Sequence, residues 1–338
     1  MLIEIEAPVP TRRGRARLLA SGMAVAVAAV IAGGLSFVAL HHPIDTPNAA
    51  GGTMPPQIAS AIPPEPMVDV PAVDSLHWQT LRETFDRIGF DLDSVASGTA
   101  AVPRVLLVSL PNDLSGIADP DARKDLFLRA FLPVVLQVNE HILQDRAQLQ
   151  ALQTKIGSGG TLSGSEVQWL LMLSDQYGQP DSDLDELMKK VDVIPTSLAL
   201  AQAIEESGWG TSRIAKGQNA MFGQFGEDPL GAWDYRAFNS LTSAVESYAR
   251  NLNTHRAYRE FRQARAKMHE KGSNLDAFTL ASTLFRYSER GPGYVKNLRG
   301  IIRDNDLKAF DSAHLDTGAK VAVIASNDDA RDVDFSRP

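Results

Sequence analysis

A long periodic pattern of apolar residues between residues 119 and 156 constrains the fold of this chain most strongly. Apolar side chains recur there at spacings of three and four, which is the period of one face of an α-helix. Similar patterns cover residues 75–88, 163–177, 181–191 and most of 195–310, so the sequence predicts a mainly α protein. The longest pattern is formed by Leu126, Phe127, Phe131, Val134, Val135, Val138 and Ile142.

Two segments depart from helical periodicity. Residues 222–238 are rich in glycine and aromatic residues, which predicts a short β-hairpin. Residues 105–110 form a short apolar run after Pro103, which predicts either a strand or a buried extended segment.

The N-terminal region has the charge pattern of a membrane anchor. Four arginines, at positions 12, 13, 15 and 17, precede an uncharged run at 18–40, which is long enough to span a bilayer. The next cation is Arg82, so the positive-inside rule places residues 1–17 in the cytoplasm. We therefore expect a single-pass membrane protein whose folded part lies on the side of the membrane away from the cytoplasm. A signal peptide cleaved near Asn48–Ala50 is the alternative, but the apolar run exceeds a usual signal-peptide core.

Composition separates the remaining segments and excludes some functions. Residues 41–75 contain eight prolines and read as an extended linker, whereas the acidic segment 312–338 reads as a disordered tail. The net charge of −8 argues against nucleic acid as a partner. The chain has no cysteine, and its seven histidines are scattered, so we expect neither a metal site nor a cofactor.

One predicted helix ends on a carboxylate. Residues 195–207 are followed by Gly208-Trp209-Gly210, and at about 100° per residue Glu206 shares a face with small residues and Gln202. A carboxylate on such a face can border a cleft, whereas a solvated surface glutamate is the simpler alternative. Trp209 could supply apolar surroundings for the Glu206 carboxyl, or it could belong to the hydrophobic core.

Several motifs resemble one bacterial family over roughly residues 76–311. The segment Ala201–Ser212, with Glu205-Glu206-Ser207-Gly208-Trp209-Gly210, resembles the signature of glycoside hydrolase family seventy-three, and more narrowly of its Bax-type glucosaminidases. Further matching segments are Val102–Leu107, Ser109–Pro111, Val138–Glu140, Asn219–Gly223, Asn251–His255, Ala257–Arg259 and Tyr287–Gly291.

The resemblance implies a lysozyme-like helical domain with a short β-hairpin lobe. Residues 76–190 would form the helical N-terminal region of the Bax-type domain and 191–311 the glucosaminidase catalytic domain. The implied substrate is the glycan strand of peptidoglycan, cut at the β-1,4 bond after N-acetylglucosamine. The implied general acid is Glu206, whose pKa a partly apolar setting would raise.

The second carboxylate is left open by the sequence. In the family it comes from the lobe after the Phe-Gly segment, where this chain offers Glu227, Asp228 and Asp234. Glu227 ranks first because it lies nearest to Phe222-Gly223. Assistance by the substrate's own acetamido group is the alternative.

The resemblance also implies supporting residues. Tyr287 would lie in the cleft, where its phenol could hydrogen-bond a sugar or orient water. Phe222 and Tyr235 are candidate sugar-stacking platforms, and Asn219 could contact an acetamido group or cap a turn. Gly223 and Tyr294 complete the implied substrate-binding set.

Two other functions fit part of the pattern. A lytic transglycosylase uses the same acid on the neighbouring bond, although Asn219–Gly223 and Tyr287–Tyr294 favour the glucosaminidase. A non-catalytic wall-binding scaffold with a relic cleft would account for the shortened lobe.

Overall fold

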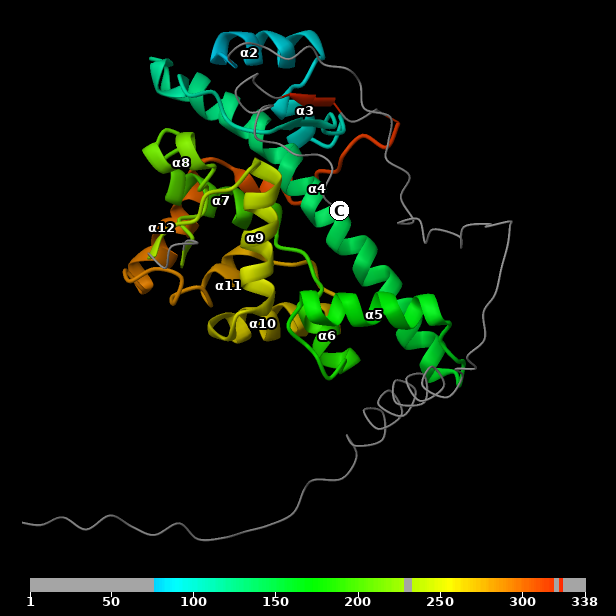
Figure 1. Ribbon diagram of the computed structural model, residues 1–338. Helices are drawn as coiled ribbons and strands as arrows, with labels where there is room; N and C mark the ends of the chain where they lie inside the picture. Colours follow the sequence, from blue (N-terminus) through cyan, green and yellow to red (C-terminus); the bar gives the residue numbers. More distant parts are fainter. Residues whose placement is uncertain (1–75, 228–232, 319–321, 325–338) are drawn as a thin grey trace, which may run out of the picture.

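The computed structural model describes residues 76–227, 233–318 and 322–324, and these form a mainly helical protein with two small sheets (Figure 1). The helices, in chain order, are α2 (Trp78–Arg87), α3 (Leu92–Ala96), α4 (Pro120–Gly157), α5 (Gly164–Gln176), α6 (Leu184–Lys190), α7 (Thr196–Ser207), α8 (Arg213–Gln218), α9 (Leu241–Thr254), α10 (Arg259–Glu270), α11 (Ala277–Ala281) and α12 (Pro292–Asp304). Short 3-10 turns are η1 (Leu114–Gly116), η2 (Arg256–Tyr258) and η3 (Leu307–Phe310). The helical patterns predicted from sequence are confirmed.

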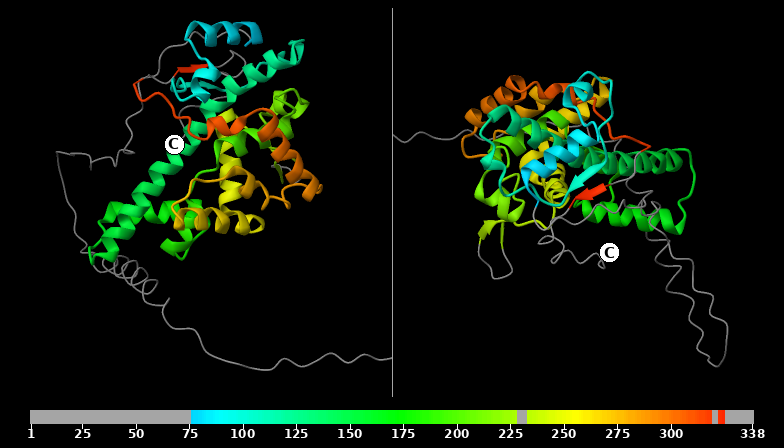
Figure 2. Two further views of the ribbon diagram at one scale, coloured as in Figure 1. Left: turned by 180° about the vertical axis from the view of Figure 1, so that it is seen from behind. Right: turned by 90° about the horizontal axis from the view of Figure 1, so that it is seen from above.

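Helix α4 extends through the whole described part of the molecule, as Figures 1 and 2 show. It begins with Asp119 accepting a hydrogen bond from the Asp121 amide, and Pro120 occupies the first turn, where its missing N–H costs nothing. Its apolar residues from Leu126 to Ile142 join the large core, which also includes α7, α9 and α12. Farther along, Leu149 and Leu152 join a second, smaller core with α5 and α6.

Helix α7 is buried on nearly every side. Ten of its 12 residues are buried, and α4, α11, α12 and η3 pack against it. Asp311 accepts hydrogen bonds from the backbone N–H of Ser197 at 2.8 Å and from its hydroxyl at 2.9 Å, which satisfies part of the helix start. The helix ends where Gly208 adopts a left-handed conformation.

The predicted hairpin and strand are both present. Strands β2 (Phe225–Glu227) and β3 (Trp233–Tyr235) pair antiparallel, with Gly226 opposite Asp234. Strand β1 (Val105–Leu107) pairs in parallel with β4 (Ala322–Ile324).

The pairing of β4 corrects one prediction from sequence. The segment from residue 312 was predicted to be disordered, yet Leu315 bridges Val102, and Leu315 and Ile324 are buried in the large core. An acidic tail can contain isolated apolar residues that complete a distant core, and composition averages conceal them. Residues 325–338 lie outside the described part of the chain.

The predicted N-terminal segments, at 1–17, 18–40 and 41–75, also lie outside the described residues. Among the residues that are described, only α4 is long and apolar enough to cross a membrane, and most of its apolar stretch is buried within the protein. We therefore interpret α4 as the central core helix.

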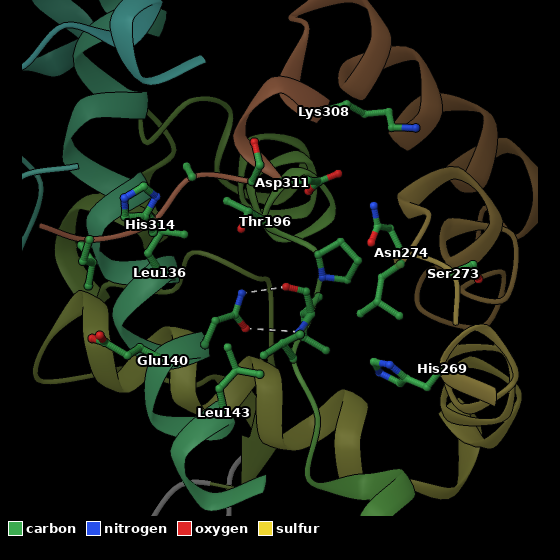
Figure 3. A pocket seen from close by; sticks show the side chains of 18 of the residues that line it. Leu136, Glu140, Leu143, Thr196, His269, Ser273, Asn274, Lys308, Asp311 and His314 are labelled. Atoms are coloured by element: carbon green, nitrogen blue, oxygen red, sulfur yellow. Dashed lines mark hydrogen bonds between the residues drawn. The ribbon is translucent and has the colours of Figure 1, made fainter. Parts of the chain in front are cut away.

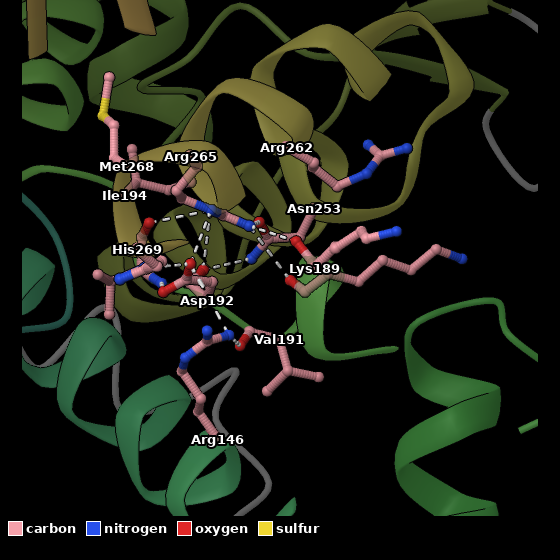
Figure 4. Close-up of polar contacts among 12 residues, drawn as sticks. Arg146, Lys189, Val191, Asp192, Ile194, Asn253, Arg262, Arg265, Met268 and His269 are labelled. Atoms are coloured by element: carbon pink, nitrogen blue, oxygen red, sulfur yellow. Dashed lines mark hydrogen bonds and ion pairs between the residues drawn. The ribbon is translucent and has the colours of Figure 1, made fainter. Parts of the chain in front are cut away.

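A buried ion-pair network joins four segments near the large core (Figure 4). The Asp192 carboxylate, in the connector between α6 and α7, lies 3.1 Å from Arg265 Nε and 2.8 Å from His269 Nε2. Arg265 is fully buried and also donates to the carbonyls of Lys189 and Val193 and to the Asn253 side chain. Burial lowers the pKa of Arg265 to about 10, an effect that Asp192 opposes, so the guanidinium stays charged at neutral pH.

We predict that Arg265→Met destabilises the protein by about 3–5 kcal/mol, because it leaves the Asp192 carboxylate buried without its main partner. The exposed pair of Arg303 and Asp304 supplies the control, since Arg303→Met should change stability by less than about 1 kcal/mol. Denaturant unfolding measures both values. Equal stability of the two variants would contradict the role given to the network.

Candidate active site

Glu206 lies at the C-terminal end of α7, directly before a tight turn built by Ser207-Gly208-Trp209-Gly210. The Ser207 hydroxyl donates to the Ala203 carbonyl at 2.5 Å and accepts from the Gly210 amide at 2.9 Å, which closes the turn. Gly210 has a φ of +72°, and a Cβ there would lie 2.5 Å from Leu110 Cδ1. Only glycine fits this position without displacing the core.

Trp209 belongs to the apolar surroundings of the turn. Its ring packs edge-on against Phe127 of α4, with 5.6 Å between the ring centroids, and the residue is half-buried. Lys124 lies over its other side, 5.7 Å from the ring centroid. Trp209 is therefore a packing residue that anchors the turn to α4.

A chain of side-chain hydrogen bonds crosses the core from Tyr248 through Gln202 to Tyr294. The Tyr248 hydroxyl of α9 donates to Gln202 Oε1 at 2.8 Å, and Gln202 Nε2 donates to the Tyr294 hydroxyl of α12 at 3.0 Å. The Tyr294 hydroxyl also interacts with the Glu206 carboxyl, and this interaction lowers the pKa of that carboxyl. Tyr248, Gln202 and Tyr294 are all buried, so their hydrogen bonds fix α7 relative to α9 and α12.

The surroundings of Glu206 favour its protonated form. Partial burial raises the pKa of Glu206 and is the largest effect. The hydrogen bond from Tyr294 lowers it, the neighbouring Glu205 raises it, and Arg290 lowers it. The net result is a carboxyl whose pKa lies above its ordinary value of 4.5.

Glu205, the residue before Glu206, forms contacts of its own with α12 and the segment before it. Its carboxylate pairs with Arg290 and accepts a hydrogen bond from Asn297, which ties the end of α7 to the start of α12. The adjacent glutamates thus have different partners, since Glu205 pairs with Arg290 and Asn297 whereas Tyr294 interacts with Glu206.

Gly223 lies directly against the acid. It has a φ of +60°, and a Cβ built on it would lie 2.9 Å from Glu206 Oε2. Any larger residue would therefore press on the carboxylate. Because Gly223 has no side chain, the Phe222-Gly223 segment that leads into the hairpin lobe can approach Glu206 this closely.

A cleft of about 450 Å³ opens beside Gly223, between the hairpin and the C-terminal half of α9. Its lining includes polar, basic and aromatic side chains, which suit a sugar with its hydroxyl groups and apolar faces. The residues that line it are Phe222, Gly223, Gln224, Phe225, Arg236, Ser247, Arg250, Asn251, Thr254, His255, Tyr258 and Tyr287.

Two of the predicted aromatic residues are in or beside the cleft. Tyr287 lines it and donates its hydroxyl to the Phe222 carbonyl at 3.0 Å, which holds the Phe-Gly segment in place. Tyr235 is half-buried and packs on Phe225, with 4.1 Å between ring centroids. Because Phe225 is 56% exposed, the hairpin presents an aromatic surface at the cleft mouth.

Other predicted binding residues are too buried for the contacts expected of them. The ring of Phe222 is 2% exposed and stacks on Tyr248, so no face of this ring is free for a sugar. Tyr294 is fully buried, and its hydroxyl interacts with Gln202 and Glu206 instead of a sugar. Asn219 is a left-handed cap of α8 whose amide donates to Ser109 Oγ and the Phe238 carbonyl.

The structure describes the three candidates for a second carboxylate to different extents. Glu227 is the last residue of β2, and its backbone pairs with that of Trp233. Asp228 lies outside the described residues. Asp234 is exposed and accepts a hydrogen bond from the Tyr235 amide at 2.7 Å.

The prediction from sequence missed several residues around the acid. Gln202 was placed on the Glu206 face but received no role, although a lone amide among apolar helix residues signals a buried hydrogen-bond partner. Tyr248 and Tyr258 were not singled out, because their proximity to the acid depends on helix packing across the core. Within the described ranges, no cluster of side chains has the composition of a metal site.

A larger cavity, of about 730 Å³, lies at the opposite end of α7 (Figure 3). Asn139 lines this cavity and exchanges two hydrogen bonds with the backbone of Ile194. Asp311 and Lys308 also line it. None of the predicted catalytic or binding residues lines this cavity. The cleft beside Gly223, although smaller, is therefore the candidate active site.

Comparisons with known proteins agree with these motifs. A family model described as Glucosaminidase, mannosyl-glycoprotein endo-beta-N-acetylglucosaminidase, matches residues 182–307. Protein bax of Escherichia coli is 32% identical over 209 residues, which cover 58% of this chain and 74% of that protein. The catalytic domain of the autolysin Auto from Listeria monocytogenes aligns with 17% identity and a TM-score of 0.26, covering 48% of this chain and 96% of that domain.

The match to the E. coli protein extends over most of its length, and the family match includes α7, the cleft and α12. Taken together, these matches establish that the chain belongs to the Bax-type glucosaminidase family.

Proposed function

We propose that this protein is a glycoside hydrolase that cuts the glycan strands of peptidoglycan at the β-1,4 bond after N-acetylglucosamine. The observation that carries the proposal is the half-buried Glu206, held at the end of a buried helix beside an open cleft. A glycosidic oxygen is a poor leaving group until it is protonated, and a carboxylic acid with a raised pKa can supply that proton.

In this proposal Glu206 is the general acid. Its raised pKa keeps a protonated fraction at higher pH than an exposed glutamate would. The interaction with Tyr294, which lowers the pKa of the carboxyl, would stabilise the carboxylate after proton transfer. Tyr287 and Gly223 form the wall against which the sugar next to the scissile bond would lie.

The second step requires a group that activates water or stabilises the positive charge at the anomeric carbon. We propose Glu227 for this role, because it ends the strand that begins at the cleft-lining Phe225. The acetamido group of the substrate is the alternative, and it would make the carboxylate dispensable. Tyr235 with Phe225 would support a more distant sugar by stacking.

The site of action follows from the sequence pattern of the N-terminal region. Arginines before an uncharged run at 18–40, followed by a proline-rich linker at 41–75, support a single-pass anchor in the inner membrane. The catalytic domain would then face peptidoglycan from the membrane side. Cleavage of the same run as a signal peptide would release the domain into the envelope.

We predict that Glu206→Gln lowers the rate of sacculus digestion by at least about 100-fold, because the amide cannot donate the proton that the leaving oxygen needs. Glu270→Gln makes the same chemical change at an exposed helix end and should keep the wild-type rate. The digest is reduced and the products are identified by mass spectrometry.

Products ending in reduced N-acetylglucosamine are expected from this digest. Anhydro-muramic ends would instead identify a lytic transglycosylase. Binding to sacculi without turnover at any pH would identify a non-catalytic scaffold. Full activity of Glu206→Gln would refute the assignment of the acid.

A second prediction concerns Gly223. We expect Gly223→Ala to lower kcat by about 100-fold, because a methyl group there displaces the carboxyl of Glu206. Gly272→Ala is the matched control, since Gly272 has a similar φ of +64° but a Cβ at that position would meet no atom within 4 Å. Both variants should lose about 1 kcal/mol of stability from backbone strain, measured by thermal unfolding. Equal kcat values for the two variants would contradict the close approach.

A further inference from the structure

A second cavity, of about 670 Å³, adjoins the candidate active-site cleft and is strongly basic. Its lining contains five side chains that carry a positive charge and a single carboxylate, that of Glu260. The net charge of the whole chain is −8, so the positive charge of this cavity is opposite in sign to that of the chain as a whole. The five cations are Lys190, Arg256, Arg259, Arg262 and Arg286.

Two of these cations have structural partners, but only neutral ones. Arg262 donates to the carbonyls of Leu252 and His255 and so satisfies the C-terminal end of α9. Lys190 donates to the carbonyls of Tyr177 and Gly178. Burial lowers the pKa of each. Attraction to the Glu186 carboxylate raises it, and repulsion from a neighbouring guanidinium lowers it. Neither charge is neutralised by these contacts.

The other three cations are not explained by folding. Arg256, Arg259 and Arg286 are exposed, and among the described residues none of them forms an ion pair or a side-chain hydrogen bond. Arg259 begins α10 and so lies at the helix end where the dipole disfavours positive charge. Such side chains are suited to a ligand that brings its own negative charge.

The basic cavity and the cleft share part of their wall. Thr254 and His255 line both, and the cleft itself contains Arg236 and Arg250. A ligand that occupied the cleft could therefore extend a charged branch past Thr254 into the basic cavity. A sugar chain without charged branches would leave the guanidiniums unused.

We infer that the basic cavity binds the carboxylates of the peptidoglycan stem peptide, while the cleft holds the glycan strand. This inference rests on the proposed function, because it deepens the description of the same substrate. Arginine matches carboxylate geometry with two parallel hydrogen bonds, so Arg256, Arg259 and Arg286 can select peptide-bearing glycan over bare glycan. The structure thus assigns substrate preference to residues that lie outside the catalytic cleft.

Hydrolysis of two substrates tests the inference. One is intact peptidoglycan strands, and the other is the same strands after enzymatic removal of the stem peptides. Arg256→Gln/Arg286→Gln should raise KM on the intact strands by about tenfold or more and leave kcat/KM on the stripped strands unchanged. The control is Arg87→Gln/Lys267→Gln, which removes two exposed cations outside both cavities and should behave as the wild type on both substrates.

A binding measurement separates this inference from the proposed function. The tripeptide L-Ala-D-Glu-meso-diaminopimelate should bind the wild-type protein and Glu206→Gln alike, and it should bind Arg256→Gln/Arg286→Gln about tenfold more weakly. If the wild type binds the tripeptide but does not hydrolyse sacculi, the inference about the basic cavity is supported and the proposed activity is refuted. Hydrolysis of both substrates with equal KM, or no tripeptide binding to the wild type, would overturn the inference.

Discussion

The hydrogen-bond chain from Tyr248 through Gln202 to Tyr294 is the interaction on which the candidate site depends. It gives both the oxygen and the nitrogen of the buried Gln202 amide a hydrogen-bond partner inside an apolar core, where an unpaired amide would cost about 1–3 kcal/mol. Because its members come from α7, α9 and α12, the chain fixes three helices relative to one another. Tyr294, at the end of this chain, interacts with the Glu206 carboxyl and lowers its pKa, so the surroundings of Glu206 depend on the packing of the core.

The same burial gives Glu206 its chemistry. A helix that is covered by α4, α11, α12 and η3 places its last turn in apolar surroundings, which raises the pKa of the carboxyl. Gly223, which has no side chain, lies against the carboxyl and also lines the cleft. Under the proposed function, the cleft would hold the glycan strand and the adjoining basic cavity its charged branch.

The sequence was sufficient for the features that local periodicity encodes. The long helix α4, the hairpin at β2 and β3, and a carboxylate at the end of α7 were all predicted from spacing and turn residues. Features that depend on distant pairing were not. Phe222 and Tyr294 are aromatic residues in matching motifs, but whether such a ring faces a cleft or a core is decided by partners such as Tyr248 and Gln202. The burial of Leu315 and Ile324 was missed for the same reason.

The pKa of Glu206, measured by NMR titration of side-chain carboxyl carbons in the purified protein, tests the central claim most directly. The Glu206 signal is identified by its absence in Glu206→Gln. The account predicts a pKa above 4.5, and a further rise in Tyr294→Phe, since loss of that hydroxyl removes a hydrogen bond that lowers the pKa. A Glu206 pKa at or below 4.5 in the wild type would contradict the account.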